Sequence, residues 1–550
     1  MLWIPVGGPL FPQNRLAPPW TCSDPDPPAR VPAHFLLGRH EPIPCLEQPP
    51  VSSLPSTGRT LAEWISASRS DFAAAAESLR TLRETLDTGS NAWISRIPAE
   101  RLEEQIRRLQ QLPSSLPLYG VPFAVKDNFD VAGWPTTAGC PGFAYHPTHS
   151  AAVVARLEAA GAVLIGKTNL DQFATGLAGT RSPYGAVVNP FDRAYVAGGS
   201  SAGSAVAVAE GLVPLALGTD AAGSGRIPAG FNNVVGLKTT RGRCSKQGVV
   251  PACPSLDCIA VFALTVDDAA IALDVIEGYD PADPWSRSDP TTDSAPSIPK
   301  SLAIPQSTEW FGDNRAELAW LGTMARMEDM GMALHAVDFT PLFELASLLY
   351  HGPWVAERHA ALGGFIEARP EAVDPVVRAI IARGREFSAS DVFEARQRRQ
   401  ELLREVRALF ASHDALLVPT APSHPLLTAI AVEPLEQDSR LGRYASFVNL
   451  ADCCALAVPA GFRVDGLPFG ISMIAPAWQD RRLLAWARVW QRHLPSLRGA
   501  TGMPAPSAGA PPAPVITKPR LAVAGPYRPL SRHSGWQQQS HLPNSKENHV

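Results

Sequence analysis

The sequence predicts an α/β fold, and two stretches in which helical and strand-like segments alternate carry this prediction. The first stretch runs from about residue 98 to 225, and the second from about 300 to 420. In both, segments with helical periodicity precede short apolar runs that are typical of buried strands. A chain of 550 residues that is 45% hydrophobic and 18% charged is long enough to bury a large core of this kind.

Two helices are expected at the start of the globular region. Residues 60–86 and 98–112 show helical periodicity, and Pro98 suits the beginning of a helix. The apolar run 121–126 that follows is predicted to be a strand that ends in polar residues.

Two helix–strand units then follow each other. Ser150 can cap a helix that Gly161 ends, and 162–165 is predicted to be a short buried strand. A small-residue helix that ends at Gly211 is followed in the same way by a strand at about 213–218. Because loops at strand ends carry catalytic groups in such folds, the polar turns after these strands are candidate site segments.

The second stretch repeats the alternation. Residues 300–306 are predicted to be a strand, 313–334 a helix and 335–339 the next strand. A long helix within 390–420 leads into a further strand. Its arginines are interpreted as a solvent-exposed face with local ion pairs.

Proline-rich sequence flanks the globular region. Residues 1–57 are predicted to be an irregular extension, 58–495 one globular domain, and 496–550 a disordered tail rich in Pro, Ala and Gly. The net charge of −4 and the absence of long basic blocks argue against nucleic acid or anionic lipid as partners. No apolar run is long enough for a membrane span, and no secretory signal is evident. The eight cysteines form neither a disulfide framework nor a metal-ligand pattern, so we expect reduced thiols, no metal and a cytoplasmic location.

Two short motifs match well-known patterns. Gly161–Thr168 fits the phosphate-binding pattern G-x-x-x-x-G-K-[ST] and would place Lys167 on a nucleotide, but its four middle residues are those of a strand rather than a loop. Residues 199–203 fit the G-x-S-x-G nucleophile elbow of α/β-hydrolases. That interpretation needs a catalytic histidine, and none of the histidines after Ser201 lies in a sequence that marks it as one.

Three segments, considered together, favour a different interpretation from these two motifs. They are "FAVKDN" with Lys126, "GGSSAGS" with Ser200, and "GTDAAGSGRIPAG" with Ser224. In order and spacing they resemble the amidase signature family of Ser–Ser–Lys amidohydrolases, over about residues 58–495. The resemblance implies a large mixed β-sheet covered by helices on both faces, and an enzyme that needs no metal or organic cofactor.

The same resemblance assigns roles to these residues. Ser224 becomes the acyl nucleophile, Ser200 the bridging serine after a cis peptide bond, and Lys126 the terminal base. The backbone N–H groups of Ala221, Ala222, Gly223 and Ser224 would form the oxyanion hole. The chemistry is coherent because a hydroxyl must lose its proton as it attacks an amide, and lysine can accept that proton only when burial keeps it neutral. The neighbouring Ser201 and Ser204 are interpreted as structural residues at a helix start.

Finer resemblance is to the allophanate hydrolases of this family, in segments 166–192, 218–238, 248–275 and 348–362. It implies that Tyr350 and Arg358 bind the substrate. A guanidinium is suited to bidentate binding of a carboxylate next to the scissile amide. The expected reaction is release of ammonia from allophanate, with a functional link to a urea carboxylase. A homodimer is expected by analogy with the family.

Two departures and two alternatives accompany this interpretation. Family members commonly have Thr where Ala221 stands, and many allophanate hydrolases carry a C-terminal domain that the tail does not resemble. The alternatives are an amidase that acts on another small amide or on glutamine, as in the transamidosome, and an inactive scaffold for a urea-carboxylating partner. The presence of Lys126, Ser200 and Ser224 argues against the scaffold.

Overall fold

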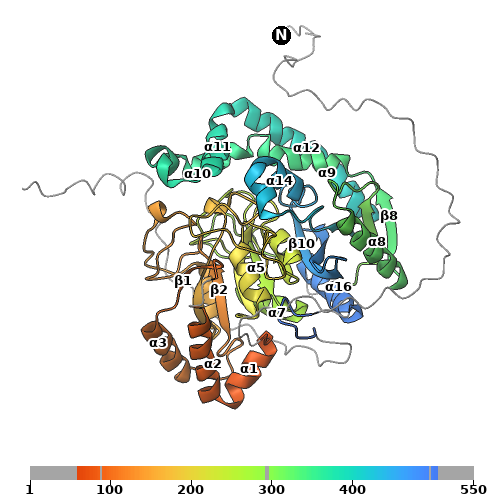
Figure 1. Cartoon of the computed structure of the whole chain (residues 1–550). Coiled ribbons are helices and arrows are strands. Elements are labelled where there is room, and N and C mark those ends of the chain that lie inside the picture. Colours follow the sequence, from red (N-terminus) through yellow and green to blue (C-terminus); the bar gives the residue numbers. More distant parts are fainter. Residues whose placement is uncertain (1–57, 87–89, 291–296, 495–496, 506–550) are drawn as a thin grey trace, which may run out of the picture. The chain divides into compact units, whose positions relative to one another are not determined.

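The computed structural model describes residues 58–86, 90–290, 297–494 and 497–505. These residues form an 11-stranded sheet in the order β1-β3-β2-β4-β6-β5-β10-β11-β9-β7-β8. Figure 1 labels the two edge strands, β1 and β8. The predicted extension 1–57 and the predicted tail from 506 onward lie outside the described residues, so the domain boundaries stay predictions. The strands are β1 (Trp93–Arg96), β2 (Pro122–Lys126), β3 (Val163–Thr168), β4 (Leu215–Asp220), β5 (Val235–Lys238), β6 (Cys258–Ala263), β7 (Ser301–Pro305), β8 (Ala333–Val337), β9 (Ala415–Pro419), β10 (Cys453–Phe462) and β11 (Pro468–Pro476).

The sheet is mixed, as the family resemblance implied. β2 runs parallel to both β3 and β4, whereas β6 is antiparallel to β4 and β5, and β10 is antiparallel to β5 and β11. The α-helices are α1 (Leu61–Ser70), α2 (Phe72–Thr85), α3 (Ala99–Gln110), α4 (Ala152–Ala159), α5 (Ala202–Ala209), α6 (Ile227–Phe231), α7 (Val266–Ile276), α8 (Asn314–Asp329), α9 (Thr340–Tyr350), α10 (Trp354–Ala368), α11 (Pro375–Ala382), α12 (Ala389–Ser412), α13 (Leu427–Val432), α14 (Pro434–Leu441), α15 (Phe447–Leu450) and α16 (Asp480–His493).

Both faces of the sheet are covered. Neighbouring residues of one strand point to opposite faces, and Leu416 and Leu417 of β9 belong to two different hydrophobic clusters. The cluster with Leu417 includes side chains of α8 and α16, and the cluster with Leu416 includes side chains of α9, α12 and α15. The expected helices on both faces are therefore present.

Most predicted elements are found, with shifted boundaries. The expected helix 60–86 is divided into α1 and α2, because Asp71 adopts an extended conformation and accepts a hydrogen bond from the N–H of Ala74 as the N-cap of α2. β8 begins two residues before its expected position. β3 extends through Thr168 and so includes Gly166 and Lys167.

Nine residues of the predicted tail are described, and several of them contact the domain. In segment 497–505, the N–H of Ala500 donates to the carbonyl of Ala209 at the end of α5. Arg498 forms an ion pair with Glu63 of α1 at 2.7 Å. This part of the expected tail therefore belongs to the packed unit. Within the described ranges, no helix combines the length and apolar character needed to cross a bilayer.

Candidate active site

Lys126 lies at the carboxyl end of β2, the central strand of the parallel group β3-β2-β4. Its side chain is fully buried, and its Nζ donates to the hydroxyl of Ser200 at 2.7 Å and to that of Thr219 at 2.9 Å. Thr219 is part of β4, the neighbouring parallel strand. The sheet thus brings together two of the three predicted catalytic residues, which are far apart in sequence.

Burial makes this lysine a base at neutral pH. The loss of solvation lowers the pKa of Lys126 to about 7, because an ammonium ion is disfavoured in an apolar interior. The carboxylates of Asp171, Asp257 and Asp220 oppose this decrease, and the positive charge of Arg358 adds to it. A substantial fraction of the amine is therefore neutral at pH 7 and able to accept a proton from Ser200.

Ser200 is held by a tightly packed glycine loop. The peptide bond between Gly199 and Ser200 is cis, which confirms the expectation drawn from the family resemblance. Position 199 must be glycine, because a Cβ there would collide with the carboxylate of Asp171. That carboxylate accepts hydrogen bonds from the N–H groups of Gly179 at 3.0 Å and Arg181 at 2.9 Å, and the N–H of Asp171 donates to the carbonyl of Ser200 at 3.2 Å.

The other two serines of this motif join the helix to the sheet. Ser201 Oγ donates to the carbonyl of Thr219 at 3.1 Å, and Ser204 Oγ donates to the carbonyl of Leu217 at 3.0 Å. Both acceptors belong to β4, against which α5 packs. These contacts support the structural interpretation of Ser201 and Ser204.

Ser224 lies in the turn that follows β4, and it is 4% exposed. The carboxylate of Asp220 organises this turn by accepting from the N–H groups of Gly223 at 2.9 Å and Gly225 at 3.0 Å. Arg226 pairs with the same carboxylate at 2.9 Å. Burial alone would raise the pKa of Asp220, but the Arg226 guanidinium and these donors hold it below its usual value. The turn is thus built around a buried carboxylate that stays ionised.

We expect the Arg226→Leu substitution to destabilise the protein by about 3–5 kcal/mol, because it leaves the Asp220 carboxylate buried without its cation. Arg226 and Asp220 are 1% and 0% exposed. Calorimetric melting would measure the effect. The matched control is Arg398→Leu, which removes ion pairs to Glu344 and Glu401 in which each side chain is more than a third exposed and should change stability by about 1 kcal/mol or less. Equal melting temperatures for the two variants would contradict the prediction.

The predicted oxyanion hole falls on the same turn. The N–H of Gly223 donates to Asp220, so it is already engaged. Within the described part of the chain, the N–H groups of Ala221, Ala222 and Ser224 have no hydrogen-bond acceptor. Three of the four predicted donors are therefore available, and their catalytic role stays a prediction. The hydrogen bonds of the described residues join Lys126 to Ser200, but none joins Ser200 to Ser224, so the second half of the proton relay is likewise a prediction.

Arg358, on the second turn of α10, is 1% exposed and makes few polar contacts. Its Nη1 donates to the Thr175 hydroxyl at 3.2 Å, and its Cζ lies 5.3 Å from the ring centroid of Tyr350. Its Nε has no hydrogen-bond partner among the described residues. Burial raises the pKa of Tyr350, so its hydroxyl remains a donor. The two predicted substrate-binding residues therefore lie together, and the guanidinium keeps donor capacity for an anion.

The two competing motifs are explained by the fold. Lys167 belongs to β3, where it forms an ion pair with Asp127, the residue after β2, at 2.8 Å and donates to the Pro135 carbonyl at 2.7 Å. It is therefore a buried strand residue and not part of a phosphate loop. The partner of Ser200 is a lysine rather than a histidine. His424, the buried histidine after Ser201, stacks on Phe231 instead. In the described ranges, no group of three or more His, Cys, Asp or Glu residues could hold a metal ion.

Comparison with known proteins agrees with this geometry. A family model described as Amidase matches residues 77–484. The chain belongs to the amidase family.

Several known proteins are similar to this amidase. It is 46% identical to urea amidolyase from Saccharomyces cerevisiae over 453 residues, which cover 80% of the chain and 25% of that protein. It is 35% identical to a component of the glutamyl-tRNA(Gln) amidotransferase from Deinococcus radiodurans, over 75% of the chain and 91% of that protein. The structure of Kluyveromyces lactis allophanate hydrolase superposes with a TM-score of 0.78 at 46% identity, covering 81% of this chain and 74% of that one. The chain thus spans about a quarter of the length of the urea amidolyase.

Thr219 is a contact of the site that the sequence analysis missed. It is the second residue of the "GTDAAGSGRIPAG" segment, but its side chain has no predicted role there, and only the parallel pairing of β2 with β4 places it beside Lys126. We expect Thr219→Val in this amidase to lower kcat about tenfold, because one N–H of the buried amine loses its acceptor. Thr219→Ser should restore most of the rate. Equal kcat values for the wild type and Thr219→Val would show that the contact does not affect catalysis.

Proposed function

We propose that this amidase hydrolyses the terminal amide of allophanate and releases ammonia through an acyl-enzyme on Ser224. The observation that carries the proposal is Arg358: a buried guanidinium whose Nε is unpartnered, beside the Tyr350 ring and close enough to Lys126 to lower the pKa of that amine. Allophanate has a carboxylate separated from its scissile amide by one nitrogen, so a cation is required where the substrate binds. The identity of 46% to urea amidolyase and to an allophanate hydrolase supports the same substrate.

In the proposed acylation step, protons move from Ser224 through Ser200 to Lys126. The neutral amine of Lys126 takes the proton of Ser200 Oγ while Ser200 takes the proton of Ser224 Oγ, and Ser224 Oγ forms a bond to the amide carbon. The N–H groups of Ala221, Ala222 and Ser224 donate to the oxygen that becomes negatively charged. The relay then returns a proton to the leaving nitrogen as the C–N bond breaks, and ammonia departs.

Deacylation runs through the same groups. Water loses a proton to the relay and attacks the ester carbon, the Ser224 ester bond breaks, and Ser224 regains its proton. The product is N-carboxycarbamate. Since allophanate is urea-1-carboxylate, the enzyme would consume the product of an activity that carboxylates urea, and this supports the predicted functional link to a urea carboxylase.

Ammonia release from allophanate by the purified protein tests the proposal. We expect turnover that Ser224→Ala abolishes and slower release from malonamide or glutamine. Greater activity on glutamine than on allophanate would instead favour the amidotransferase-like alternative. Failure of a fluorophosphonate to label Ser224 would favour the inactive scaffold.

A further inference from the structure

Glu357, the residue before Arg358, attaches α10 to a neighbouring loop by hydrogen bonds. Glu357 Oε1 accepts from the N–H of Ser255 at 2.6 Å, and Oε2 accepts from Ser255 Oγ at 2.6 Å and from the Cys253 thiol at 3.0 Å. All three donors belong to one short loop segment. Consecutive helix residues point in different directions, so Glu357 binds this loop while Arg358 points to Thr175 and Tyr350.

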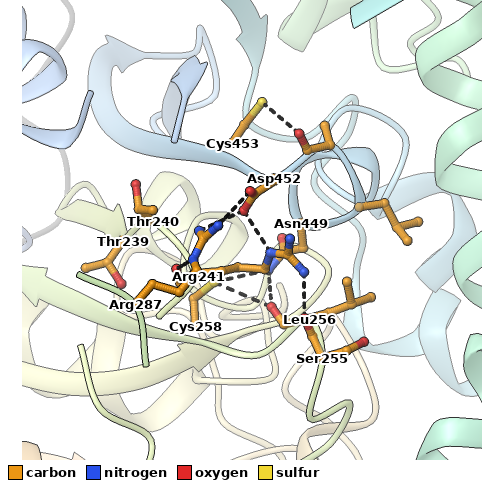
Figure 2. A network of polar contacts seen from close by, with 12 residues as sticks. Thr239, Thr240, Arg241, Ser255, Leu256, Cys258, Arg287, Asn449, Asp452 and Cys453 are labelled. Carbon is orange, nitrogen blue, oxygen red and sulfur yellow. Dashed lines mark hydrogen bonds and ion pairs between the residues drawn. The ribbon is translucent and has the colours of Figure 1, made fainter. Parts of the chain in front are cut away.

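The loop that binds Glu357 is held in place by further hydrogen bonds on both sides. The carboxylate of Asp257 accepts from the N–H groups of Ala252 at 2.9 Å and Cys253 at 3.0 Å. On the other side, Arg241 donates to the carbonyl of Ser255 at 2.7 Å and to Asp452 at 2.9 Å (Figure 2). Glu357 is therefore attached to a part of the structure that resists displacement.

One side-chain amide connects this loop to the turn of Ser224. Asn449 is fully buried, and its Nδ2 donates to the carbonyl of Leu256 at 3.0 Å and to the carbonyl of Asp220 at 2.8 Å (Figure 2 shows Asn449 beside Leu256). Asp220 is the residue whose carboxylate organises the turn of Ser224. A continuous set of contacts thus runs from Glu357 through the loop and Asn449 to that turn.

From this connection we propose that Glu357 is a positioning residue that fixes Arg358 relative to Ser224 and so selects substrates by the distance between their carboxylate and their amide. The inference rests on the proposed function. A guanidinium at a fixed distance from the nucleophile accepts a carboxylate one atom away from the amide carbonyl, as in allophanate or malonamate, better than one that is two atoms away, as in succinamate. Without Glu357, Arg358 stays on α10, but the distance between its guanidinium and Ser224 is no longer fixed.

The test measures how malonamate and succinamate protect Ser224 from labelling by a fluorophosphonate, which has no carboxylate. In the wild type, we expect malonamate to protect at least tenfold better than succinamate. In Glu357→Ala the unprotected labelling rate should stay within about twofold, protection by malonamate should weaken about tenfold, and the preference over succinamate should shrink. Glu357→Gln keeps an acceptor for the N–H of Ser255, so its protection by malonamate should lie between that of the wild type and that of Glu357→Ala. Glu367→Ala is the matched control, because Glu367 is also on α10 but pairs with His359 and Arg385 at the surface.

Each result decides the inference. Protection constants in Glu357→Ala equal to those of Glu367→Ala overturn it, and so does a loss of labelling in proportion to the loss of protection, since that indicates only structural damage. If Glu357→Ala is insoluble, the ratio of protection by malonamate to protection by succinamate is measured in Glu357→Gln instead. A ratio equal to that of Glu367→Ala then overturns the inference. A wild type that releases no ammonia from allophanate but shows the expected protection pattern refutes the proposed function alone. Allophanate turnover with no protection by malonamate refutes the inference alone.

Discussion

Replacement of Lys126 by alanine is expected to lower kcat/KM for ammonia release by about 10⁴-fold, because it removes the proposed acceptor of the Ser200 proton. No other described side chain can take over, since the Ser200 hydroxyl has Lys126 as its side-chain partner and Thr219, the second partner of Lys126, is not a base. Steady-state assays together with the rate of fluorophosphonate labelling of Ser224 would measure the loss in two independent ways.

A control from the same loop sharpens this prediction. Ser201→Ala removes the neighbouring hydroxyl, which donates to the Thr219 carbonyl, and should reduce activity by less than about tenfold because no proton of the reaction passes through it. If Lys126→Ala retained more than a tenth of wild-type activity with an unchanged melting temperature, another group would have to be the base.

Replacement of Arg358 by alanine is expected to lower kcat/KM for allophanate by about 10²–10⁴-fold, mainly through KM. A buried guanidinium that binds a carboxylate makes two charge-assisted hydrogen bonds, each of which contributes about 1.5–3 kcal/mol. The substitution also removes a positive charge that lowers the pKa of Lys126, so the midpoint of the pH–rate profile should move upward. Steady-state kinetics from pH 6 to 9 would measure both effects.

The conservative variant separates charge from geometry. Arg358→Lys keeps a cation but not the planar pair of donors, so we expect it to recover only part of the loss. Because the charge is kept, the pH midpoint should stay closer to that of the wild type. An unchanged KM in Arg358→Ala would mean that the substrate carboxylate binds elsewhere.

The sequence predicted the local elements of the fold better than their assembly. Apolar runs, and the glycines that end the helices before them, located β2, β3 and β4 to within a few residues, because these signals are local. The order of the strands depends on pairings between distant segments, such as β5 with β10, for which no local pattern exists. Nor did the periodicity of 60–86 reveal the break at Asp71, since the apolar pattern continues on both sides of that residue.

The site residues also differ in whether local sequence or only distant contacts identify them. Lys126, Ser200 and Ser224 could be selected because each lies in a distinctive motif. Thr219 and Glu357 lie inside segments that the sequence analysis singled out, but nothing local assigns them a role; Asn449 lies outside those segments. Their contacts appear only when β2 lies beside β4 and the loop before β6 lies beside α10 and α15. Their roles depend on what they contact, and contacts between distant segments are not written in the local sequence.

The pH dependence of fluorophosphonate labelling at Ser224 tests the central claim most directly, because the probe needs an activated serine but no carboxylate receptor. Burial lowers the pKa of Lys126 to about 7, and only the neutral amine can accept a proton. The account predicts that the labelling rate rises with pH, with a midpoint near 7, falls to about a tenth of its plateau one unit below that midpoint, and disappears in Lys126→Ala. A rate that is constant from pH 6 to 9, or one that rises only near the ordinary pKa of lysine, would contradict it.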